Sequence, residues 1–114
     1  SGGALMFRIV TGRQPATPIQ QSFFRAGHAH AGVYLILGLI AQVLVDATTL
    51  TGLAEWVARA FIPIAALLLP GGFFLSVARP GATEPNRLVV LIPAGAAVLA
   101  IGLAVLGIGL LVAG

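Results

Sequence analysis

The sequence has no cysteine, no lysine and few charged side chains of any kind. Without cysteine the chain forms no disulfide, no thiolate metal site and no cysteine nucleophile. Charged residues make up 8% of the chain, whereas about 25% is usual in a soluble domain. Because 59% of the residues are apolar, we expect an all-α integral membrane protein.

The length of the chain limits the number of domains. A membrane helix takes about 20 residues, so 114 residues allow three or four spans with short connections. A separate soluble domain of about 100 residues does not fit beside them. We therefore predict a single transmembrane helical domain over residues 1–114.

The six arginines exceed the three acidic residues and give a formal net charge of +3. Proteins that bind nucleic acid cluster their basic residues on one solvated face, whereas these arginines are scattered at the ends of apolar runs. We predict no binding to nucleic acid. The expected partners are the lipid bilayer and either other membrane subunits or further copies of this chain.

Polar breaks that contain proline or glycine divide the chain into apolar segments. We predict membrane spans at approximately 18–47, 56–78 and 88–113. Thr17 can cap the first helix, and Pro18 suits its first turn because proline has no N–H group to leave unpaired.

Residues 1–10 form a fourth apolar segment that is too short to cross a bilayer and is interrupted by Arg8. We expect it to be the tail of a partial fourth span whose beginning is missing. An interfacial N-terminal stub is the alternative.

Two prolines, Pro63 and Pro70, lie inside the second predicted span. Each removes a backbone hydrogen bond and should bend the helix. Because lipid offers no donor to the freed carbonyl, we expect neighbouring helices to cover these sites. At the start of the same span, Glu55 and Arg59 lie one helical turn apart, and we expect them to form an ion pair.

Arginine is unevenly distributed between the two sides of the predicted bundle. If the spans alternate in direction, five arginines share one side and only Arg59 lies near the other. The five are Arg8, Arg13, Arg25, Arg79 and Arg87. Since cytoplasmic loops carry an excess of arginine, we predict a multi-pass cell-membrane protein with cytoplasmic arginine-rich loops and an external C-terminus.

Several polar residues recur at intervals of three or four along the first span and share one stripe of the helix. In order, the stripe contains Gln21, Arg25, His28, Gly32, Leu35, Leu39, Gln42 and Asp46. One interpretation is a proton or solute path from His28 to Asp46. The structural interpretation leaves only Gln42 as a polar contact between helices, and we favour it because the stripe has no ionisable group between His28 and Asp46.

The two histidines of the chain, His28 and His30, are two positions apart. This spacing is about 200° of helical rotation, so both rings reach one ion only if the helix is broken there. A metal site normally needs three or four ligands, and the chain offers no further histidine or cysteine. We predict no metal or cofactor. Haem or copper held by one histidine and a ligand from another chain is the alternative.

Small residues are placed where helices could pack closely. In the first span these are Gly27, Ala31 and Gly32, and in the third span Gly95, Gly102 and Gly109 recur every seven residues. Such spacing keeps small side chains on one face and allows close backbone approach. We expect these faces to pack within the bundle or against a partner.

The sequence contains no recognisable catalytic set, so we expect a non-catalytic protein. Our first hypothesis is a small accessory or structural subunit that packs against a larger membrane complex through its glycine and alanine faces. The second is an oligomeric small transporter or proton-coupled carrier that uses His28 and Asp46. The third is a redox subunit in which His28 or His30 binds haem or copper.

Overall fold

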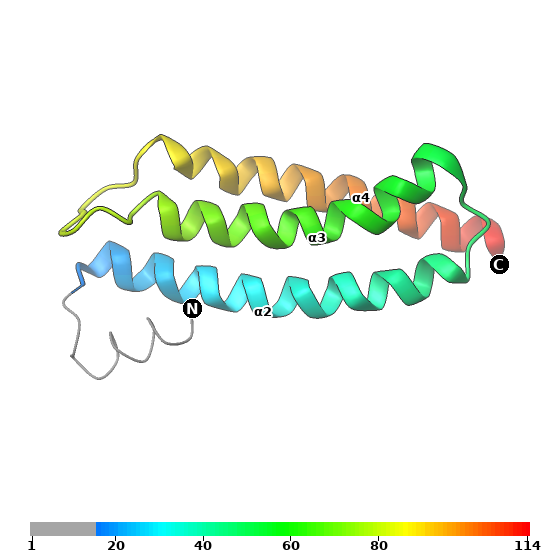
Figure 1. Ribbon diagram of the computed structural model, residues 1–114, viewed down its shortest axis with the longest axis horizontal. Coiled ribbons are helices and arrows are strands. Elements are labelled where there is room, and N and C mark those ends of the chain that lie inside the picture. The colour runs from blue at the N-terminus through cyan, green and yellow to red at the C-terminus, as the bar shows by residue number, and fades with distance from the viewer. Residues whose placement is uncertain (1–15) are drawn as a thin grey trace.

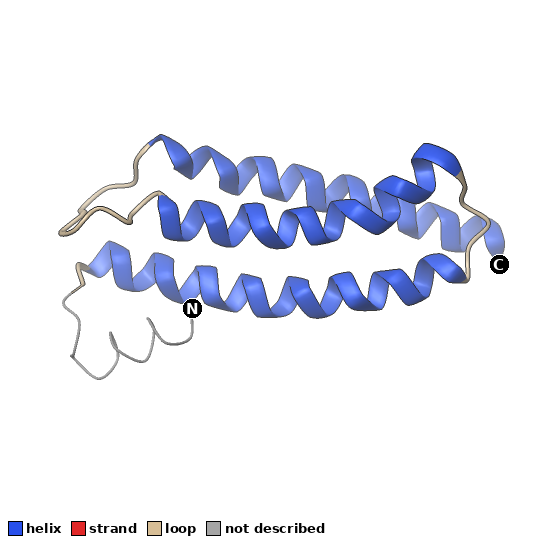
Figure 2. Cartoon of the chain, viewed as in Figure 1, coloured by secondary structure: helices blue, strands red, loops and turns tan. Residues whose placement is uncertain are grey.

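The computed structural model describes residues 16–114 and contains three long helices connected by two short loops (Figure 2). They are α2 (Pro18–Asp46), α3 (Gly52–Leu75) and α4 (Leu91–Ala113), and a short 3₁₀ helix, η1 (Arg87–Val90), leads into α4. All three helices are long and apolar enough to cross a membrane. Residues 16–114 contain no strand, and the partial span predicted at residues 1–10 lies outside the described residues.

The helix α3 is the central element of the fold (Figure 1). It packs along both α2 and α4, which touch each other little, and the molecule measures 51 × 26 × 17 Å. One core cluster joins the three helices near the connection between α2 and α3. It is formed by Ala41, Val45, Ala58, Ile62 and Leu106. The described fold is therefore a layer of three helices with α3 in the middle.

The start of α2 agrees with the prediction from Thr17 and Pro18. Thr17 is the N-cap, Pro18 begins the helix, and Gln20 completes a capping box by accepting the Thr17 backbone N–H at 3.0 Å. The buried Gln20 amide also donates to the carbonyls of Val77 at 3.1 Å and Arg79 at 2.9 Å. The cap of α2 thereby holds the segment that leaves α3.

The second predicted span begins earlier than expected, at Gly52 rather than Trp56, and ends at Leu75 rather than residue 78. Gly52 has a φ of +61°, a left-handed conformation that glycine adopts without steric cost. The turn is therefore complete by Gly52, and the residues before Trp56 are free to form the first helical turn.

The loop between α3 and η1 is held by Asn86. Its backbone N–H donates to the Ser76 carbonyl at 2.7 Å, and its side chain donates to the Leu75 carbonyl at 3.1 Å. The same side chain accepts the Leu88 N–H at 2.8 Å and so caps η1. Asn86 therefore connects the end of one helix to the start of the next.

Glycine sets the close approach of α4 to its neighbours. A Cβ atom on Gly102 would lie 2.8 Å from the Phe61 Cβ, and one on Gly95 would lie 3.1 Å from the Leu69 backbone nitrogen. Gly109 lies similarly close to Leu50 in the connection before α3. The glycines spaced by seven thus face residues of their own chain.

Candidate functional site

A polar cluster joins α2 to α3 near their connection. The Arg59 guanidinium lies 2.7 Å from the Asp46 carboxylate and 3.1 Å from that of Glu55. It also donates to the backbone carbonyl of Gln42 at 3.3 Å and to its side-chain oxygen at 3.4 Å. The Glu55–Arg59 ion pair expected from the sequence is present, but Arg59 also connects the two helices through Asp46 and Gln42.

The Gln42 side chain fills a gap that Pro63 creates in the backbone of α3. In a regular helix the N–H of residue 63 would donate to the carbonyl of Arg59, and proline has no such N–H. The Gln42 amide donates to that carbonyl at 2.7 Å. The expectation that a neighbouring helix covers the carbonyl freed by a proline is thus met at Pro63. The sequence pointed to Gln42 and to Pro63, but not to their pairing.

Most residues of the predicted polar stripe are exposed. Gln42 is half-buried, and the other seven members are exposed. The exposed members are Gln21, Arg25, His28, Gly32, Leu35, Leu39 and Asp46. The side chain of Asp46 is 72% exposed and is held by Arg59. The described residues place no ionisable side chain between His28 and Asp46 along this stripe.

The ring of His30 is fixed by its own helix and by an aromatic neighbour on α3. Its Nδ1 atom lies 2.6 Å from the Ala26 carbonyl, and its ring centroid is 4.9 Å from that of Phe73 and 5.5 Å from that of Tyr34. A carbonyl only accepts hydrogen bonds, so Nδ1 carries the hydrogen and the Nε2 of a neutral ring keeps its lone pair. Phe73 was not identified from the sequence, because the contact depends on how α3 packs.

The structure separates the two histidines. His28 is exposed on the outer stripe of α2, whereas His30 is half-buried and contacts Phe73. Within residues 16–114, no three side chains of histidine, cysteine, aspartate or glutamate come together as a possible metal site. The two rings are therefore distinct chemical groups, and only His30 has an orientation fixed by a hydrogen bond that the structure describes.

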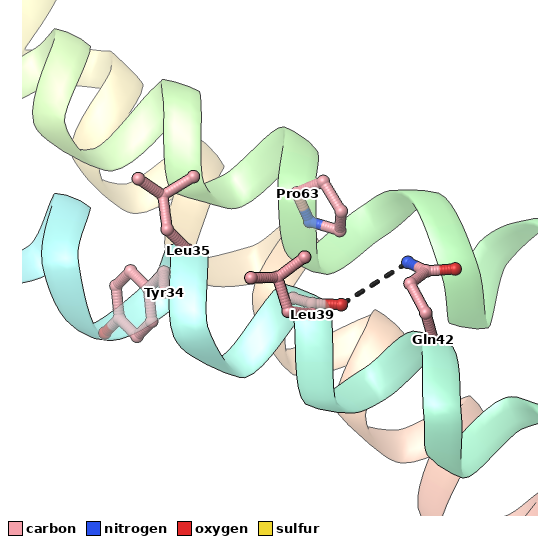
Figure 3. A pocket seen from close by; sticks show the side chains of 6 residues that line it. Tyr34, Leu35, Leu39, Gln42 and Pro63 are labelled. Atoms are coloured by element: carbon pink, nitrogen blue, oxygen red, sulfur yellow. Dashed lines mark hydrogen bonds between the residues drawn. The ribbon is translucent and has the colours of Figure 1, made fainter.

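Two hollows lie along α2. The larger has a volume of about 310 Å³ and opens between α2 and α3, with Tyr34 at one end and Gln42 at the other (Figure 3). Its other lining residues are Leu35, Gly38, Leu39 and Pro63. The smaller, about 180 Å³, is lined by Ala29, His30, Val33 and Tyr34. Both are shallow and mainly apolar, and only the smaller includes an imidazole.

The small residues of α2 have different environments. A Cβ atom on Gly27 would lie 2.8 Å from the ring of Phe74, so this glycine packs against α3. Ala31 is half-buried. Gly32 is exposed, and a Cβ atom there would have nothing within 4 Å. Of these three residues, Gly32 is therefore the one that leaves open space beside the helix.

Comparison with known proteins gives no assignment for this chain. No family model, no curated protein and no solved structure matches it.

Proposed function

We propose that this chain is a small accessory subunit of a larger membrane assembly and that it contacts this assembly through the exposed face of α2. In this proposal the three helices span the cell membrane, with the arginine-rich loops in the cytoplasm and the C-terminus outside. The observation that supports it most is the outward position of His28 and Gly32 on a helix long and apolar enough to span.

Exposed polar groups at this depth favour a protein neighbour over lipid. Ionisable side chains in membrane segments usually face a protein interior or water, because hydrocarbon does not solvate them. His28 lies next to the uncharged part of α2, which begins at residue 29. Gly32, one turn further, leaves room for another backbone to approach. Together they describe a surface that suits a second membrane helix.

The glycine face of α4 does not support the same role. Gly95 and Gly102 lie against α3 of the same chain, so the lack of a side chain at these positions serves the internal packing. A substitution there would disturb the fold and would not report on a partner. The test therefore belongs on α2, where a new side chain has open space.

The test compares the size of the native assembly for two matched variants. We expect wild-type protein, extracted gently from native membranes, to migrate in a discrete complex larger than the single chain. Gly32→Leu should shift most of the protein to the size of the free chain, whereas Gly107→Leu should not. Gly107 of α4 is the matched position, because a Cβ atom there would also have nothing within 4 Å. A wild-type monomer, or equal behaviour of both variants, would contradict the proposal.

A second candidate function is haem binding by His30 in a redox assembly. The observation that favours it is the hydrogen bond from Nδ1–H to the Ala26 carbonyl, which leaves Nε2 with its lone pair. Histidines that bind metals usually donate their other N–H to a carbonyl or carboxylate in this way. The second axial ligand would have to come from another chain.

Haem titration separates this candidate from the first. If His30 is the ligand, added haemin gives a shifted Soret band that His30→Ala abolishes and His28→Ala leaves intact. If both variants bind as the wild type does, or if the wild type does not bind, the haem candidate is rejected. The hypothesis of a transporter that uses His28 and Asp46 stays an alternative without a supporting contact between them in the described residues.

A further inference from the structure

We propose that the end of the bundle that carries Arg25, Arg79 and Arg87 binds the phosphate groups of anionic phospholipids. This proposal does not depend on the accessory role of the chain. It concerns the end where the α3–α4 loop meets the start of α2, on the left in Figure 1.

The fold brings these arginines together from three separate segments. Arg25 lies on α2, Arg79 in the loop after α3, and Arg87 at the start of η1. The loop is tied to α2, because the Gln20 amide donates to the Arg79 carbonyl at 2.9 Å. It is tied to α3 through Asn86, the residue before Arg87. The backbone positions of the three arginines are therefore held at one end of the bundle.

The charges at this end are not neutralised by the described residues. Both ion pairs in residues 16–114 are made by Arg59, which lies at the opposite end. Arg25, Arg79 and Arg87 are exposed and take part in neither pair. With Glu84 as the one carboxylate of the loop, three guanidinium groups leave a charge of +2. At the other end, Asp46, Glu55 and Arg59 sum to −1.

The position of the arginines along the bundle suits the headgroup region. Arg25 is five residues beyond Gln20, or about 7.5 Å further along α2, so the three side chains sit at more than one depth. Arginine side chains can extend along apolar surface while their head groups reach the interface. A guanidinium group binds phosphate oxygens in a bidentate manner. An anionic lipid therefore complements this end in charge, whereas a zwitterionic lipid brings a cation of its own.

The experiment measures lipid retention on the purified full chain by native mass spectrometry. We expect the wild type to retain phosphatidylglycerol in preference to phosphatidylcholine of the same acyl chains. The variant R25Q/R79Q/R87Q should lose this preference, with affinity falling by about fivefold for each arginine removed. R59Q is the control for the loss of an arginine at the opposite end, where the charge is already met by two carboxylates. Its circular dichroism is compared with that of the wild type because Arg59 also joins α2 to α3. R59Q should keep the preference.

Further measurements decide between the outcomes. Circular dichroism of the triple variant should match the wild type, since its three arginines are exposed and unpaired in the described residues, and the three single variants serve if it does not. Equal retention of both lipids by the wild type, or an unchanged preference in the arginine variants, would overturn the proposal. Retention of inorganic phosphate as strong as that of the lipid would also overturn it, because the site would then recognise the free anion.

Discussion

At the scale of single residues, the pair formed by Gln42 and Pro63 explains why a glutamine and a proline occur in two neighbouring apolar helices. A glutamine in an apolar helix and a proline in the next one are each unfavourable alone. Pro63 leaves the Arg59 carbonyl without its helical donor, and the Gln42 amide donates to this carbonyl at 2.7 Å. The two residues therefore compensate for each other. The polar stripe therefore has a structural explanation at its one half-buried position.

This pairing predicts a specific coupling between two substitutions. Gln42→Leu leaves the Arg59 carbonyl unpaired and should lower the free energy of unfolding in detergent by about 1 kcal/mol. In a Pro63→Ala background, the alanine N–H supplies the missing donor, so the same substitution should cost clearly less. Thermal or denaturant unfolding of the four proteins measures the coupling. Equal costs in the two backgrounds would show that the bond does not serve this carbonyl.

At the scale of the helices, sequence reasoning identified the elements better than their contacts. Thr17 and Pro18 marked the start of α2 because capping is a local property of the chain. The helix α3 begins earlier than predicted, because the turn before it ends at Gly52, which has a positive φ. The prediction relied on Trp56 as an interfacial residue and did not consider this turn. Which helix faces a given glycine depends on tertiary packing, so the sequence could not distinguish Gly102, against Phe61, from Gly32, in open space.

Two glycines of α4 provide the test at this scale. Gly102→Ala should lower the melting temperature, since its Cβ would lie 2.8 Å from the rigid Phe61 Cβ and overpacking costs about 1–3 kcal/mol. Gly107→Ala should leave it unchanged or raise it, because nothing lies within 4 Å and alanine favours the helix by about 1 kcal/mol. Both can be followed by thermal unfolding in the same detergent. A Gly102→Ala protein as stable as the wild type would contradict the packing of α4 on α3.

At the scale of the whole molecule, the three helices differ in how much of their surface is packed against the other two. The central helix α3 covers Gly95 and Gly102 of α4 and the buried side of α2, while His28 and Gly32 of α2 stay exposed. Composition was sufficient to predict three apolar helices, because each of them is a long apolar segment bounded by polar breaks. Composition could not predict which helix face stays exposed, since that depends on how the segments pack.

The most direct measurement of the proposed role is site-specific photo-crosslinking in native membranes. A photo-reactive residue is placed at position 32 on α2 and, as the control, at position 107 on α4, both of which have open space beside the helix. We predict one discrete protein adduct from position 32 and lipid adducts alone from position 107. Lipid adducts alone from both positions would show that the exposed face of α2 meets the bilayer, and the proposed docking role would be wrong.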